Sequence, residues 1–159
     1  KIAEYAFTTL QPQLGVVSIE DHRRFVVADI PGLIEGAHSG TGLGDEFLRH
    51  IERTKLLVHL LDVSPYAATN PVDAYNIVRK ELEQYNPLLA EKPEIIVANK
   101  MDLLDEEDGA ECIRILEQSI SKSVCPVSMV TGKNIKTLIR LVASALDDIQ
   151  AQVSTSLCG

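Results

Sequence analysis

Residues 94–102 read EIIVANKMD, an apolar run that ends in the tetrapeptide NKMD at positions 99–102. A continuous apolar run of this length is typical of a strand that is covered on both faces of a sheet. Polar residues directly after such a strand lie at its carboxyl end, where ligands bind in open parallel sheets. The stretch therefore predicts a buried parallel strand and marks 99–102 as a candidate binding loop.

The spacing N-K-x-D is suited to recognising a guanine base. The Asp102 carboxylate has two acceptor oxygens, which can accept from N1–H and the 2-amino group of guanine together. Adenine lacks the 2-amino group and has an acceptor at N1, so it would leave that charge unpaired. Lys100 can lay its aliphatic stem along the base, and Asn99 can bridge the base and a neighbouring loop. The alternative is a capping loop before a helix that begins near Asp105.

Composition limits the class of protein. The 159 residues suit one domain with one core, and the 45% of hydrophobic residues argue against disorder. A formal net charge of -8 argues against nucleic-acid binding by the domain as a whole. No apolar run approaches the roughly 18 residues of a membrane span, and the first ten residues do not resemble a signal peptide. Three scattered cysteines favour a reducing, cytoplasmic location and no metal cluster of side chains.

The whole chain alternates apolar runs with amphipathic segments. Strands are expected at 14–20, 23–30, 55–63, 94–100 and 123–129, and helices at 44–54, 69–85, 107–120 and 134–150. A tight turn joins the first two strands. The order predicts an α/β fold, with a mostly parallel sheet and helices on both faces. Loops that follow strands are therefore the places to look for a site.

A second such loop is DIPG at 29–32. The Asp29 carboxylate can hold a hydrated Mg²⁺, because this ion prefers oxygen ligands and keeps several waters. Gly32 lets a backbone N–H approach a terminal phosphate, since it has no Cβ. Taken alone, this short pattern is weak and is more often a plain turn.

Two further segments carry weaker signals. The loop VSMVTG at 127–132 can present backbone N–H groups to a base carbonyl, but it also fits an ordinary turn. Thr8 and Thr9 offer hydroxyls that can ligate Mg²⁺, although paired threonines are more often simple strand-formers. The four signals nevertheless occur in the order T, D-x-x-G, N-K-x-D and S, and together they are far rarer by chance than singly.

In this order the chain resembles the small GTPases of the translation-factor type. Three stretches bring it closer to the Obg family of bacterial GTPases, namely YAFTTLQPQLGVV, FVVADIPGLIEGAHSGTGLGDEFLRHIERT and IIVANKMDLL. The glycine-rich EGAHSGTGLG at 35–44 is the most diagnostic segment. The resemblance runs from about Lys1 to Ile149.

The resemblance implies a GTP-binding and GTP-hydrolysing switch that acts in large ribosomal subunit assembly and stress responses. It implies Mg²⁺ as the cofactor, Thr9 (or Thr8) and Asp29 as its ligands, and no catalytic side chain. The implied partners are GTP or GDP and the large ribosomal subunit, with no membrane. The GTP-binding set that it implies is Asp29, Ile30, Pro31, Gly32, Asn99, Lys100, Met101, Asp102, Ser128, Met129 and Val130.

One departure from the family pattern is the lack of a P-loop, G-x-x-x-x-G-K-[ST], anywhere in the sequence. The resemblance places that loop upstream of KIAEYAFTT. We therefore expect a P-loop-NTPase-like G domain at 1–149 without its first strand, P-loop and first helix, followed by a tail at 150–159. An interaction module without nucleotide turnover is the alternative. An unrelated doubly wound domain, such as a receiver, fits the N-K-x-D position poorly.

Overall fold

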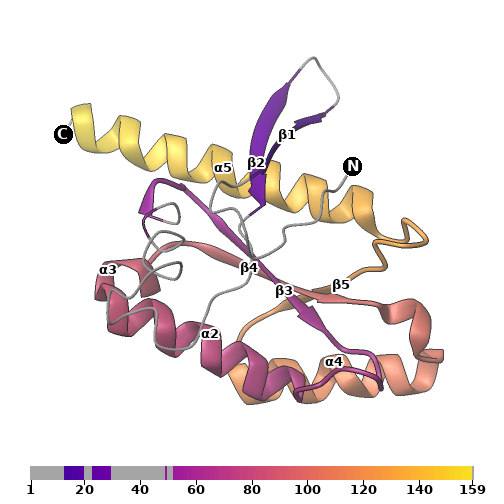
Figure 1. The fold of residues 1–159 in the computed structure, drawn as a ribbon. Helices are drawn as coiled ribbons and strands as arrows, with labels where there is room; N and C mark the ends of the chain where they lie inside the picture. Colours follow the sequence, from indigo (N-terminus) through magenta and orange to yellow (C-terminus); the bar gives the residue numbers. More distant parts are fainter. Residues whose placement is uncertain (1–12, 20–22, 30–48, 50–51, 159) are drawn as a thin grey trace. The chain divides into compact units, whose positions relative to one another are not determined.

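The computed structural model describes residues 13–19, 23–29, 49 and 52–158 (Figure 1). The chain divides into two compact units, and each is described by itself. The first unit comprises residues 1–54 and 78–91, and the second comprises 55–77 and 92–159. The described strands form a two-stranded sheet in the first unit and a three-stranded sheet in the second.

The first unit contains an antiparallel hairpin of β1 (Gln13–Ser18) and β2 (Arg24–Asp29). Pairing runs through six residues of each strand, and the Ile19 N–H donates to the Arg23 carbonyl across 2.7 Å at the turn end. The two predicted strands are thus confirmed. Their apolar side chains are not all covered, since Val16 and Val26 are 61% and 64% exposed.

The second unit is built on a parallel sheet in the order β3-β4-β5, formed by β3 (Leu57–Asp62), β4 (Glu94–Asn99) and β5 (Val124–Pro126). The middle strand β4 is the apolar run EIIVAN, and its Val97 and Ala98 are 0% exposed. A central parallel strand lies between two neighbours and under layers on both faces, which is why its sequence is continuously apolar.

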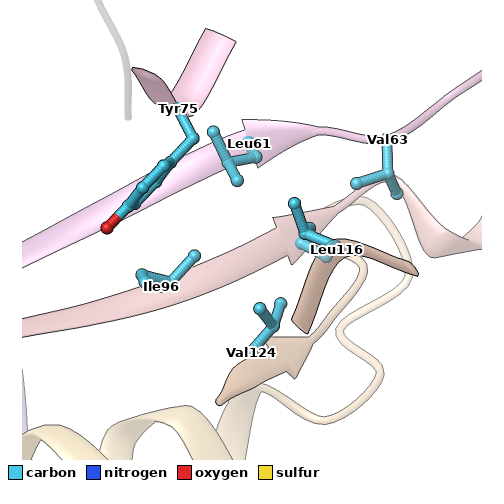
Figure 2. Packing of buried hydrophobic residues seen from close by; sticks show 7 residues of the cluster. Leu61, Val63, Tyr75, Ile96, Leu116 and Val124 are labelled. Atoms are coloured by element: carbon cyan, nitrogen blue, oxygen red, sulfur yellow. The ribbon is translucent and has the colours of Figure 1, made fainter. Parts of the chain in front are cut away.

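Helices lie on both faces of this sheet, as the sequence predicted, although Val58 and Leu60 of β3 are still 40% and 51% exposed. Figure 1 shows α4 (Glu106–Ile120) on one side of β3-β4-β5 and α5 (Ile135–Cys158) on the other. The first turns of α2 (Pro71–Tyr85) add Tyr75 to the core on the α4 side. The buried cluster comprises Leu61, Val63, Tyr75, Ile96, Ala98, Leu116 and Val124 (Figure 2).

Local capping explains where α4 begins. The Asp105 side chain accepts from the Asp108 N–H at 2.7 Å, and the first turn carries three acidic residues near the positive end of the helix dipole. The short α3 (Pro87–Ala90) was not predicted. It forms because Asn86 accepts from the Leu88 N–H at its start and Pro87 needs no hydrogen-bond acceptor.

Some predicted boundaries differ from the structure. The strand expected at 123–129 is observed only at Val124–Pro126, as β5. The Val127 N–H still donates to the Ala98 carbonyl, but a turn closed by the Gly132 N–H and the Ser128 carbonyl follows directly. The helix α5 continues through Cys158, into the segment assigned above to a tail. Of the helix expected at 44–54, most lies outside the described residues, although Arg49 and Glu52 are helical.

Candidate nucleotide site

The carboxyl ends of β3, β4 and β5 meet at one edge of the sheet. The parallel register sets Asp62 opposite Asn99 and Ala98 opposite Pro126. Main-chain hydrogen bonds continue beyond the strands, from the Val63 N–H to the Asn99 carbonyl and from the Met101 N–H to the Val127 carbonyl, both 3.2 Å. We call residues 62–64, 99–102 and 127–132 the carboxyl edge.

Asn99 ties two of these loops together. Its Oδ1 accepts from the Lys100 N–H at 2.8 Å and from the Met129 N–H at 3.0 Å. The side chain therefore makes the predicted bridge to a neighbouring loop. Among the described residues, nothing accepts from its amide NH₂ group, which leaves two donors available.

Lys100 leaves the strand with a left-handed backbone, φ 74° and ψ 30°. This conformation is uncommon for a residue with a Cβ, and such strain is characteristic of functional turns. The Lys100 Nζ lies 2.9 Å from Asp62 Oδ2, while the Ser64 N–H donates to Asp62 Oδ1 at the same distance. Burial raises the pKa of Asp62, but hydrogen bonds from Lys100 and Ser64 outweigh it and hold that pKa below its ordinary value.

Asp102 lies in the short 3₁₀ turn η2 (Met101–Leu103) that follows Lys100. Its Oδ1 accepts from Ser128 Oγ at 2.8 Å, and Ser128 is only 1% exposed. Ser128 Oγ also accepts from the Thr131 N–H at 3.2 Å, so its hydroxyl is fixed from both sides. The result is an exposed carboxylate whose direction is set by a buried serine.

The apolar members of the predicted site differ in exposure. Met101 packs against the core. Met129 and Val130 are 44% and 84% exposed on the loop after β5. This loop is closed by the Gly132 N–H, which donates to the Ser128 carbonyl at 2.8 Å with Gly132 at φ 82°.

The predicted phosphate side can be placed only in part. Asp29 is the last residue of β2, at the carboxyl end of its strand, as expected. Ile30, Pro31, Gly32, Thr8 and Thr9 lie outside the described residues. Within the described part of the chain, no group of three or more His, Cys, Asp or Glu side chains could hold a metal ion. No described helix is long and apolar enough to cross a membrane.

The sequence analysis missed Asp62. It is a single acidic residue inside the apolar run LLVHLLDV at 56–63, so periodicity alone gave it no weight. Its position at the carboxyl end of a parallel strand was the available signal. Only the pairing register shows that it faces Asn99 and reaches Lys100.

Residues 1–100 match the protein-family model described as 50S ribosome-binding GTPase. The chain belongs to this family. The match covers more than half of the sequence and includes the predicted strand ends at Asp29 and Asn99.

Curated relatives agree with this assignment and confirm the recognition of an Obg-type G domain. A protein named GTPase Obg from Acetivibrio thermocellus is 49% identical over 149 residues, which is 94% of this chain and 35% of the relative. A GTPase Obg from a Sulfurihydrogenibium species is 50% identical over 155 residues, 96% of this chain and 44% of the relative. The chain thus spans less than half the length of these relatives.

The fold is also found in a solved structure of low sequence similarity. A crystal structure described as nucleolar GTP-binding protein 1 from Plasmodium falciparum matches with a TM-score of 0.62 at 14% identity. The match covers 89% of this chain and 73% of that chain. The predicted α/β G-domain class is therefore confirmed.

Proposed function

We propose that the carboxyl edge binds the guanine base of GTP and GDP, and that the protein acts as a GTP-hydrolysing switch. One observation carries this proposal. Asp102 is an exposed carboxylate at the end of the central strand, and a buried Ser128 hydroxyl holds it in a fixed direction. Fixed acceptors of this kind are what discrimination between bases requires.

The chemistry of Asp102 favours guanine. Its Oδ1 already accepts from Ser128, and each carboxylate oxygen has a second lone pair, so the group can still accept two hydrogen bonds from a ligand. Guanine offers N1–H and a 2-amino group side by side, whereas adenine offers an acceptor at N1. An adenine base would leave the carboxylate facing an acceptor, which costs binding free energy.

Lys100 and Asn99 support the same ligand. The Lys100 side chain is 47% exposed and is anchored at its tip by Asp62, so its methylene stem can lie along a planar base. The Asn99 amide is held by two backbone N–H donors and presents its NH₂ group. A base bound against Asp102 would have an apolar surface and two donors next to it.

The phosphate side of the proposal rests on Asp29, Gly32 and Thr9. Oxygen atoms of a carboxylate and a hydroxyl are suitable ligands for Mg²⁺, which prefers oxygen donors. When bound, Mg²⁺ would neutralise phosphate charge during hydrolysis. Asp29, at the carboxyl end of β2, would hold the ion directly or through a bound water. We include Ile30 and Pro31 in the proposed GTP-binding set because they lie between Asp29 and Gly32 in the sequence.

The relatives support a proposal for the cellular role. The family description names 50S ribosome binding, and the matched relatives are named GTPase Obg. We therefore propose action on the large ribosomal subunit, with a role in its assembly and in stress responses, in the cytoplasm. The alternative, an interaction module without nucleotide turnover, is favoured only by the lack of a P-loop pattern in these 159 residues.

The first experiment is a change of base specificity. The variant Asp102→Asn is made in a version of the protein that is extended upstream through a phosphate-binding loop. Its GDP binding should be weaker by about 2–4 kcal/mol in binding free energy. The same variant should gain affinity for xanthosine diphosphate, because an amide NH₂ suits the 2-oxo group of xanthine. Asp148→Asn is the matched control, since Asp148 is an exposed carboxylate on α5. Unchanged guanine preference in a competition titration would reject the site.

The second experiment separates the switch from the interaction module. The 159-residue chain should bind GTP very weakly, because no P-loop amides or lysine offset the charge of the triphosphate. The extended version should bind it tightly. Calorimetric titration of both with GTP and Mg²⁺ tests this expectation. If the extended version also fails to bind, the module interpretation is correct.

A further inference from the structure

We propose that Asp62 is a positioning residue for nucleotide binding, which acts by fixing the Lys100 side chain across the sheet edge. The inference rests on the proposed guanine site and adds a residue to it. Asp62 is the last residue of β3, whereas Lys100 follows β4. The two are 38 residues apart in sequence, and the parallel pairing of β3 with β4 brings them together.

The geometry of Asp62 divides two tasks between its two oxygens. Oδ1 accepts from the Ser64 N–H at 2.9 Å and forms the turn that ends β3. Oδ2 accepts from Lys100 Nζ at 2.9 Å. One task is local and structural, while the other reaches the candidate base-binding lysine. Because the tasks use different atoms, substitutions can separate them.

Lys100 has a particular need for such an anchor. A lysine side chain has four rotatable bonds, and fixing it costs a large part of its rotamer entropy. Its backbone is already fixed, with φ 74° and its N–H donated to Asn99 Oδ1. The Asp62 contact fixes the far end as well. The stem is then held before a ligand arrives, and less entropy is lost on binding.

The contact is not explained well as a stabilising ion pair. The side chains are 47% exposed for Lys100 and 37% exposed for Asp62. Exposed pairs of this type contribute little to folding. The Arg114–Glu111 pair on α4 is comparable in kind, with a distance of 2.6 Å and both side chains more than half exposed, but it lies away from the carboxyl edge. It provides a control within the same chain.

The test uses two substitutions with opposite predictions, in the version extended upstream through a phosphate-binding loop. Asp62→Asn keeps an oxygen for the Ser64 N–H but removes the charge that faces Lys100. Asp62→Glu keeps the charge but lengthens the side chain that forms the turn. If Asp62 acts through Lys100, Asp62→Asn should lower the affinity for a fluorescent GDP analogue roughly three- to tenfold. Asp62→Glu should stay within about threefold of the unsubstituted protein.

A double-mutant cycle gives the decisive readout. Lys100→Met should weaken GDP binding by itself. In that background, Asp62→Asn should change the affinity by less than about twofold, because the residue it acts through is gone. Glu111→Gln should leave the affinity unchanged in both backgrounds. Thermal unfolding of each variant shows whether a loss of binding reflects a loss of folded protein.

The outcomes distinguish the possible failures. Additive losses from Asp62→Asn and Lys100→Met would overturn the proposal, as would a larger loss from Asp62→Glu than from Asp62→Asn. Both would place the role of Asp62 in the turn at Ser64. If Lys100→Met and Asp102→Asn leave GDP binding intact, the guanine site itself is wrong and this inference falls with it. Loss only with Asp102→Asn would keep the site and remove Lys100 and Asp62 from it.

Discussion

The strands β2 and β4 have similar sequences and different surroundings. They read RFVVAD and EIIVAN, and each ends in a residue of the predicted nucleotide site, Asp29 or Asn99. In β2, Val26 is 64% exposed, whereas Val97 in β4 is 0% exposed. Among the described strands β2 pairs only with β1, while β4 pairs with parallel neighbours on both sides. An apolar sequence thus specifies a strand, but its packing partners decide how deeply the strand is buried.

The largest expected effect concerns a buried polar pair between β3 and β4. His59 Nδ1 lies 2.9 Å from Glu94 Oε2, and the two side chains are only 9% and 4% exposed. The imidazole also stacks on the Tyr75 ring, with 5.3 Å between the ring centroids. His59→Leu would remove this partner from a buried carboxylate. We expect a loss of about 3 kcal/mol in the free energy of unfolding, measured by urea denaturation.

Lys122 is a second, more exposed partner of the Glu94 carboxylate. Its Nζ lies 3.7 Å from Glu94 Oε1 and is 46% exposed. Lys122→Met should therefore cost well under 1 kcal/mol. Equal losses from His59→Leu and Lys122→Met would mean that the burial of the His59–Glu94 pair does not govern its contribution.

The next effect tests the comparison of β2 and β4 directly. Val97→Ala removes two methyl groups from a fully buried side chain, and we expect a loss of about 2–3 kcal/mol. Val26→Ala makes the same chemical change on an exposed side chain and should cost within about 0.5 kcal/mol. Urea denaturation of both variants provides the measurement. A large effect of Val26→Ala would show that β2 is covered in solution.

A smaller effect is expected at the carboxyl edge. Ser128→Ala removes the hydroxyl that holds Asp102 and that accepts from the Thr131 N–H. The loss in unfolding free energy should be about 1–2 kcal/mol, since the buried Ser128 hydroxyl makes both of these hydrogen bonds. Guanine affinity should fall too, because Asp102 is no longer fixed. Ser123→Ala, an exposed serine ahead of β5, is a suitable control for both measurements.

The smallest effect is a pH dependence at Asp62. Its pKa is lowered in the folded protein, so it adds stability above the ordinary pKa of an aspartate, and this contribution is lost as pH falls through the folded value. Asp62→Asn should therefore destabilise slightly at neutral pH and not at all in strong acid. Thermal unfolding across pH tests this. A difference that persists in strong acid would assign the effect to something other than the charge.

The sequence predicted the elements of the carboxyl edge but not all of its contacts. Asn99 and Asp102 were identified because a buried strand followed by N-K-x-D is a strong local signal, and Ser128 was identified by its place after the last strand. The Asp62–Lys100 contact was missed, because it depends on which residues of two strands lie opposite each other. The left-handed backbone of Lys100 was also missed, since lysine has no preference for that conformation.

The β1-β2 hairpin shows which features could be predicted from local sequence and which could not. Its two strands and turn were predicted, because antiparallel neighbours are connected locally and the pattern is short. The exposure of Val16 and Val26 was not, because burial depends on other parts of the chain. Local pattern thus predicted the strands in both regions, and the remaining features required knowledge of tertiary contacts.

The long sequence separations at the carboxyl edge also set an order of events during folding. The β1-β2 hairpin closes across a few residues, which takes microseconds in general. Contacts at the edge join residues 38 apart for Lys100 and Asp62, 30 for Met129 and Asn99, and 26 for Ser128 and Asp102. Such loops close more slowly, and each contact also needs its parallel strand pair in place. A chain emerging from the ribosome would thus complete this edge only after residue 131 is available, so its ability to bind a base would arise after the hairpin has formed.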